Sequence, residues 1–284
     1  MKLNQLIIKA KEILYENLKE FKGNRIVVPH LNGYPMPYCW DTAFHVLALS
    51  HIDPLIAKEN IEALLSLQKE DGMIPNAPTE VYNQDLRSQP PIIIYAVNYY
   101  SNVTKDFESL SNWYPKLKKF YEWWNNYGDP IDSINGLVSP FTGARREDEM
   151  MAYWAICSTG MDNHALYDFV NGKNLKRDNF YYIPIEDLLL NNVLAADAEA
   201  LFEIANKLGI ENDVKKFRAR SRDLYRNFFF RACHRIFIRL PGYQRNRTQQ
   251  DLCCRIIFCC IPDIHRFLRV IPGCLYGQCR RSMG

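Results

Sequence analysis

Residues 53–68, DPLIAKENIEALLSLQ, carry the pattern that decides the fold. Asp53 is a favourable N-cap, and Pro54 suits the first helical turn because its missing N–H has no helical partner there. Ile61, Leu64 and Leu65 then recur at spacings of three and four residues, as on one face of a helix. The stretch therefore predicts a helix that begins directly after Asp53.

The same apolar spacing recurs through residues 1–229, where strand-like alternation is nearly absent. Further helices are expected over residues 3–21, 41–50, 92–100, 110–124, 187–208 and 214–228. Short connectors alternate with long ones at residues 22–40, 70–89 and 128–160. Successive helices joined by short connectors run antiparallel, so the long connectors should all emerge at one end. This arrangement predicts an all-α fold: an incomplete (α/α)6 toroid of helical hairpins.

Composition places the chain among ordinary globular proteins. It has 284 residues, of which 48% are hydrophobic and 24% charged, and this excludes a disordered or collagen-like chain. No run of about 18 apolar residues occurs, so no transmembrane helix is expected. Residues 1–18 lack the continuous apolar core of a signal peptide. A cytoplasmic location and no membrane partner are therefore expected.

The C-terminal residues 230–284 differ from the rest of the chain. They hold 10 arginines, no lysine, no glutamate and 7 of the 9 cysteines, whereas residues 1–229 hold 25 basic and 30 acidic residues. Zinc or nucleic-acid binding is one reading of such a tail. However, Cys253-Cys254 and Cys259-Cys260 are adjacent pairs without metal-ligand spacing. We interpret residues 230–284 as a frameshifted tail and not a native domain, with a genuine but unusual terminus as the alternative; no metal and no nucleic-acid partner are expected.

The first long connector ends in aromatic residues beside a carboxylate. Tyr38 and Trp40 offer rings on which sugar C–H faces can stack, and Asp41 can accept hydrogen bonds from hydroxyl groups. The alternative is that Trp40 belongs to the core and Asp41 is a first-turn carboxylate favoured by the helix dipole. His45, one turn further on, is expected to be a core histidine with a satisfied ring.

The second long connector contains Asp71-Gly72, a turn signal, and then Ser88-Gln89 before Pro90-Pro91. The proline pair restricts the backbone around Gln89, whose amide is both a donor and an acceptor. Gln89 is therefore a second candidate for sugar contact. The alternative is that the motif only caps the following helix through Ser88.

The third long connector contains Gly160-Met-Asp162-Asn163. The glycine permits close approach of the backbone, and Asp162 with Asn163 puts a carboxyl beside an amide. A carboxyl shielded by aromatic neighbours can hold its proton near neutral pH and act as an acid. An Asx turn or helix cap is the alternative. Further along, Asp197 or Glu199 is expected on an exposed helix face.

Four motifs then occur in a fixed order: YCWDTAFH at 38–45, DGMIP at 71–75, SQPP at 88–91 and GMDN at 160–163. Together they resemble the (α/α)6-barrel glycoside hydrolases of family 63, closest to mannosylglycerate/glucosylglycerate hydrolase-like members, with trehalase and α-glucosidase I as more distant relatives. The resemblance implies inverting cleavage of α-glycosides, with an Asp acid and a distant Glu base. It assigns the acid to Asp162 and sugar contacts to Tyr38, Trp40, Asp41, Gln89 and Asn163. The implied substrate is a small α-glucoside or α-mannoside, and no cofactor is implied.

Two departures from the family pattern affect the expected activity. Ser158-Thr159 precedes the acid motif and His164-Ala165-Leu166 follows it, where relatives commonly have Glu-Ser and Ser-Pro-Arg. No motif like that of the family's base occurs in residues 230–284, which also leave too little chain for six hairpins. We therefore expect a truncated, inactive copy. A non-catalytic sugar-binding or inert remnant is the alternative, and a sugar epimerase would need catalytic histidines that the long connectors do not clearly supply.

Overall fold

The computed structural model describes residues 3–76, 87–127, 137–139, 141–143, 175–177, 180–182 and 187–238. The helices are α1 (Leu3–Glu16), α2 (Cys39–Ile52), α3 (Pro54–Leu65), α4 (Ile93–Thr104), α5 (Phe107–Tyr127), α7 (Leu188–Lys207) and α8 (Glu211–Ile238). The strands are β1 (Leu18–Phe21), β2 (Asn24–Val27), β3 (Phe141–Gly143), β4 (Leu175–Arg177) and β5 (Phe180–Tyr182). Helices dominate this part of the chain, which confirms the predicted all-α class.

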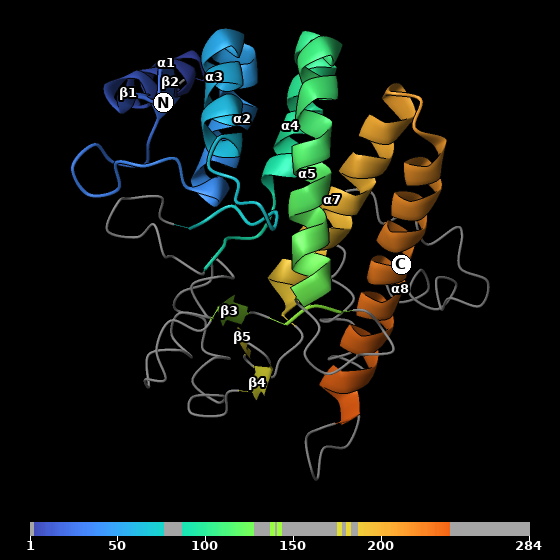
Figure 1. The fold of residues 1–284 in the computed structure, drawn as a ribbon. Helices are drawn as coiled ribbons and strands as arrows, with labels where there is room; N and C mark the ends of the chain where they lie inside the picture. Colours follow the sequence, from blue (N-terminus) through green and yellow to red (C-terminus); the bar gives the residue numbers. More distant parts are fainter. Residues whose placement is uncertain are drawn as a thin grey trace, which may run out of the picture. The chain divides into compact units, whose positions relative to one another are not determined.

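Helices α2 and α4 lie side by side and run in the same direction (Figure 1). At their starts, the Cys39 thiol donates a hydrogen bond to the Pro90 carbonyl at 3.7 Å. At the end of α2, the His51 ring nitrogen Nε2 lies 2.7 Å from the hydroxyl of Tyr99, further along α4. Because the paired positions advance together along both helices, the two helices are parallel.

Helix α7 continues this layer on the other side of α4. Near its start, α4 contacts Asp197, which accepts a hydrogen bond from the Tyr95 N–H at 3.0 Å. Further along both helices, the Lys207 ammonium donates to the Asn98 side chain at 2.6 Å. The paired positions again advance together, so α2, α4 and α7 form one layer of parallel helices, which we call the inner layer.

Helices α3, α5 and α8 form a second layer. Lys58 pairs with Asp106 at 3.2 Å, and the Lys116 ammonium donates to the Leu65 carbonyl at 3.1 Å, so α3 and α5 are parallel. Between α5 and α8, Lys118 pairs with Asp213 at 2.9 Å and the Arg220 guanidinium donates to Asn125 at 2.9 Å. This outer layer lies antiparallel to the inner one, since only Asp53 separates α2 from α3 and the two helices pack against each other. The long connectors therefore lead to the N-termini of the inner helices.

The helix boundaries follow the local sequence signals. The Asp53 carboxylate accepts a hydrogen bond from the Ile56 N–H at 3.3 Å, which confirms the predicted N-cap of α3. Helix α7 begins after Asp187, whose side chain accepts from the Leu190 N–H at 2.7 Å. Gly209, with φ of 72°, follows its end, where glycine readily adopts the left-handed backbone conformation of a helix terminus.

The prediction of one helix over residues 3–21 is wrong beyond Glu16. Strands β1 and β2 pair there as an antiparallel hairpin. Lys22 and Gly23 adopt positive φ angles of 50° and 80°, which suit the tight turn between the strands. The apolar residues at positions 18 and 21 therefore lie on a strand, and their three-residue spacing gave a false helical signal.

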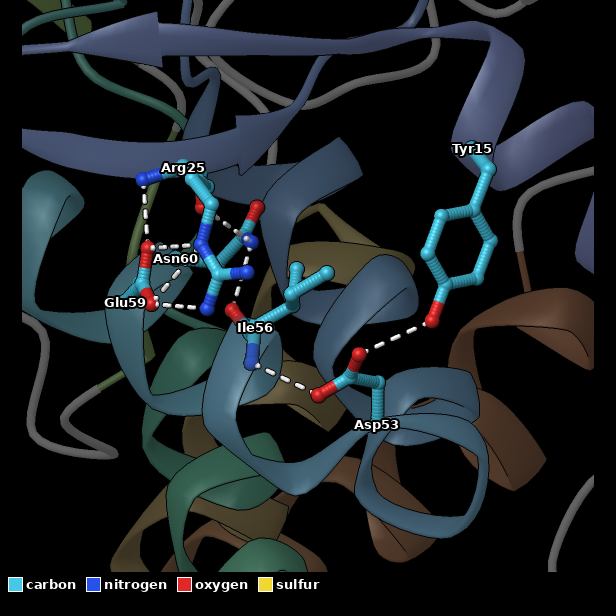
Figure 2. Close-up of polar contacts among 6 residues, drawn as sticks. All are labelled: Tyr15, Arg25, Asp53, Ile56, Glu59 and Asn60. Atoms are coloured by element: carbon cyan, nitrogen blue, oxygen red, sulfur yellow. Dashed lines mark hydrogen bonds and ion pairs between the residues drawn. The ribbon is translucent and has the colours of Figure 1, made fainter.

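Polar contacts attach this hairpin and α1 to the outer-layer helix α3 (Figure 2). The buried Asn60 side chain accepts from the Val27 N–H at 3.0 Å. Glu59 accepts hydrogen bonds from the guanidinium of Arg25 and, at 2.6 Å, from its backbone N–H. The Tyr15 hydroxyl donates to Asp53 at 2.8 Å, so the end of α1 is bonded to the cap of α3.

The buried apolar side chains of α2, α3, α4, α5, α7 and α8 form one cluster between the two layers. Its largest fully buried members include Trp123, Trp124, Phe120 and Phe217. The contacts divide the chain into two compact units, Met1–Phe228 and Phe229–Gly284. Among the described helices, none is both long and apolar enough to cross a membrane.

Candidate active site

The candidate site begins at the start of α2, where the first long connector ends. Tyr38 is the N-cap with extended backbone, and it contributes no side-chain capping bond. Its ring meets that of Tyr34 edge-on at 6.1 Å, and the ring of Trp40 meets that of Phe44 edge-on at 5.3 Å. Tyr34 and Phe44 are 62% and 46% exposed, and Trp40 is only half-buried. Aromatic surface is therefore accessible here, which disfavours the alternative that Trp40 belongs to the core.

Gln89 joins the second long connector to this site. Its side-chain oxygen Oε1 accepts a hydrogen bond from the Trp40 N–H at 2.9 Å, across 49 residues of sequence. A helix leaves its first backbone N–H groups without helical partners, and Gln89 satisfies one of them. The hydroxyl of Ser88 instead donates to the Ile74 carbonyl at 2.7 Å, and α4 has no side-chain cap. Ser88 therefore does not cap α4, which excludes that alternative.

Asp41 and His45 differ in their surroundings. Burial raises the pKa of the Asp41 carboxyl, and a hydrogen bond from its own backbone N–H partly offsets this. Burial lowers the pKa of His45, whose Nδ1 lies 3.1 Å from the Val27 carbonyl oxygen. His45 therefore fixes the β2 segment against α2, as expected for a core histidine.

The turn at Asp71-Gly72 has a structural role. The Asp71 carboxylate accepts from the Met73 N–H at 3.0 Å and from the indole N–H of Trp123 at 3.1 Å. Gly72 has a φ of 106°, and a Cβ atom added there would lie 2.7 Å from the Lys119 carbonyl oxygen. Only glycine fits this position, so the motif fixes the connector against α5.

Asp162 and Asn163 lie outside the described residues. Their roles as general acid and sugar contact therefore stay predictions. Of the other sugar-contact candidates, the structure brings Tyr38, Trp40, Asp41 and Gln89 together at the paired starts of α2 and α4.

Of Asp197 and Glu199, one of which was expected on an exposed helix face, Glu199 is exposed and Asp197 is buried. Asp197 is 0% exposed, and its Oδ2 atom has no hydrogen-bond partner among the residues that the structure describes. Burial raises the pKa of this carboxyl well above its ordinary value, and the hydrogen bond from the Tyr95 N–H acts weakly against that. The sequence does indicate burial, because Asp197 lies three residues after Leu194 and four before Leu201, on the same helix face as these apolar residues.

No group of three or more His, Cys, Asp or Glu side chains suited to a metal ion occurs among the described residues. The chemistry available at the start of α2 is therefore that of aromatic rings, a carboxyl and an amide. This combination is typical of a site for an uncharged, hydroxyl-rich ligand.

Residues 34–236 match the domain described as "Mannosylglycerate hydrolase MGH1-like glycoside hydrolase domain". The chain belongs to this glycoside hydrolase family. Among curated relatives, trehalase from Apis mellifera is 25% identical over 216 residues, covering 65% of this chain and 34% of the trehalase. Mannosylglycerate hydrolase MGH2 from Selaginella moellendorffii is 25% identical over 206 residues, covering 65% of this chain and 36% of the relative. The chain thus spans about a third of the length of these relatives.

The fold matches solved structures of the same kind. The GH63 mannosylglycerate hydrolase from Thermus thermophilus in complex with Tris superposes with a TM-score of 0.57 and 20% identity, covering 76% of this chain and 63% of that one. The complex of that enzyme with glucose gives a TM-score of 0.55, 20% identity, and coverage of 76% and 64%. These likenesses confirm the helical toroid fold.

Proposed function

We propose that this chain carries the sugar-binding and acid-bearing part of an inverting α-glycosidase site for small α-glucosides or α-mannosides. In this proposal Asp162 is the general acid, and the sugar contacts are Tyr38, Trp40, Asp41, Gln89 and Asn163. The hydrogen bond between Gln89 and the Trp40 N–H carries the proposal, because it joins two family motifs that are far apart in sequence. The named relatives act on mannosylglycerate or are trehalases, which supports an α-linked substrate.

Each side chain has a defined task in this proposal. The rings of Tyr38 and Trp40 stack on the apolar faces of the sugar, and Asp41 accepts hydrogen bonds from its hydroxyl groups. Since Oε1 of Gln89 is held by the Trp40 N–H, its amide nitrogen is the atom left to donate to a sugar oxygen. Asp162 donates its proton to the leaving oxygen as the glycosidic bond breaks.

We further propose that the chain as given binds sugar without hydrolysing glycosides. Inversion needs a second carboxylate about 6.5–9.5 Å from the acid to activate the attacking water. Glu211 is the last glutamate in the sequence, and Asp251 and Asp263 lie in no motif like that of the family's base. An acid without its base gives no useful rate, so we expect binding and no turnover. The frameshift interpretation of residues 230–284 is part of this proposal.

Calorimetric titration with glucose tests the sugar site, and α-glucosides, α-mannosides and glycosylglycerates test turnover. We expect glucose to bind, Gln89→Leu to weaken binding at least tenfold, and Leu55→Ser to leave it unchanged. Leu55 is the matched control, because it is 67% exposed at the start of the outer helix α3. Absence of glucose binding would refute the sugar site. Robust turnover would refute the proposed inactivity.

The role of Asp162 requires an active enzyme. In a chimera of residues 1–229 with the C-terminal segment of a mannosylglycerate hydrolase, Asp162→Asn should lower turnover by about 10²–10⁴-fold. The amide keeps the shape of the carboxyl but has no acidic proton, so glucose affinity should change less than twofold. Unchanged turnover in this variant would remove Asp162 from the acid role.

A further inference from the structure

Asp197 lies where α7 packs against the start of α4. It projects from α7 and is fully buried, and its Oδ1 accepts the Tyr95 N–H in the first turn of α4. Tyr95 is the third residue of α4, so this N–H is one of the donors that a helix start leaves without a helical partner. α4 has no side-chain cap of its own, and the carboxyl of Asp197 takes that role from another helix.

A short path joins this helix start to the sugar contacts on α2. The Pro90 and Pro91 carbonyls accept the Ile92 and Ile94 N–H groups at 2.9 Å each, which makes the proline pair part of the start of α4. The Pro90 carbonyl also accepts the Cys39 thiol at 3.7 Å. Because proline fixes its own φ and restricts the residue before it, the position of α4 determines that of the preceding Gln89.

We infer that Asp197 is a positioning residue of the sugar site: by holding the start of α4, it keeps Gln89 in place against the Trp40 N–H. That Gln89 and Asp197 serve a sugar site rests on the proposed function. The coupling between the two helix starts rests only on the contacts described above.

The neighbours of Asp197 favour a neutral carboxyl. Cys39 on α2, Tyr121 on α5 and Tyr225 on α8 interact electrostatically with it, and none of these side chains carries a positive charge. Burial raises the pKa of Tyr121 to about 12 and that of Tyr225 further, so both phenols keep their protons near neutral pH. Two charged side chains interact with these phenols, Arg220 with Tyr121 and Glu199 with Tyr225.

Amide hydrogen exchange followed by NMR tests the coupling directly. In Asp197→Ala the Tyr95 and Trp40 amides should exchange at least tenfold faster than in the wild type. Asp197→Asn keeps an acceptor oxygen in the same place and should restore the wild-type rates. The matched control is Asp213→Ala, which removes another largely buried aspartate, bonded to Lys118 between α5 and α8. In Asp213→Ala the Trp40 amide should exchange no faster than the overall loss of stability of that variant predicts.

Glucose titration gives the second readout. Asp197→Ala should weaken glucose binding at least tenfold, and Asp197→Asn should stay within twofold of the wild type. If the wild type bound no glucose, the proposed function would fail, while the exchange of the Trp40 amide would still test the coupling. Equal Trp40 exchange in Asp197→Ala and Asp213→Ala, or failure of Asp197→Asn to restore it, would overturn the inference.

Discussion

Replacing Asp197 by asparagine should change how the stability of the protein depends on pH. Burial raises the pKa of Asp197 in the folded state well above 3.8, the value expected for the unfolded chain. Between these two pKa values the folded state holds a proton that the unfolded state has lost. The contribution of this group to stability is therefore complete below pH 3.8 and falls as the pH rises towards the folded pKa.

The size of the effect follows from proton linkage. One proton released on unfolding lowers the free energy of unfolding by about 1.4 kcal/mol for each pH unit. The amide of Asp197→Asn can accept the Tyr95 N–H but does not titrate. The free energy of unfolding of this variant, minus that of the wild type, should thus rise with pH above 3.8, with a slope of up to about 1.4 kcal/mol for each pH unit below the folded pKa of Asp197.

The measurement is urea unfolding at half-unit pH intervals, monitored by circular dichroism. Taking the difference between variant and wild type removes the pH dependence of the other carboxyl groups. Asp223→Asn is the control, because it makes the same replacement at an aspartate that is exposed on α8. Parallel curves for Asp197→Asn and the wild type would show that the buried carboxyl is ionised, and would refute the reasoning.

Three further outcomes are expected. Asn60→Ala should destabilise the protein by about 1–3 kcal/mol in thermal unfolding, because the buried Val27 N–H loses its acceptor. Burial alone would raise the pKa of Asp213, but hydrogen bonds from Lys118 and Tyr114 outweigh it and lower that pKa. The stabilisation by Asp213 is therefore complete above its unfolded pKa and is lost as the pH falls through its lower folded pKa. In Asp213→Asn, the free energy of unfolding should no longer show this decrease at acidic pH. Treatment with EDTA should leave the calorimetric affinity for glucose unchanged, and a loss of binding would reveal a required metal ion.

The sequence by itself determined features that depend on contacts within a few residues. Asp53 and Asp187 accept N–H groups three residues ahead, and Gly209 follows the end of α7 with a positive φ. Such bonds form between neighbours in sequence, so residue type and spacing are enough to predict them. Four motifs in order were likewise enough to indicate the glycoside hydrolase family.

Only the tertiary structure decided which distant groups meet. The bond between Gln89 and the Trp40 N–H spans 49 residues, and that between Asp197 and the Tyr95 N–H spans 102. Both depend on which residues of α2, α4 and α7 come level with one another in the layer, which no local pattern specifies. Asp197 shows the physical reason: a carboxylate is usually solvated, and only the packing of α7 against α4 buries this one at an N–H group that needs an acceptor.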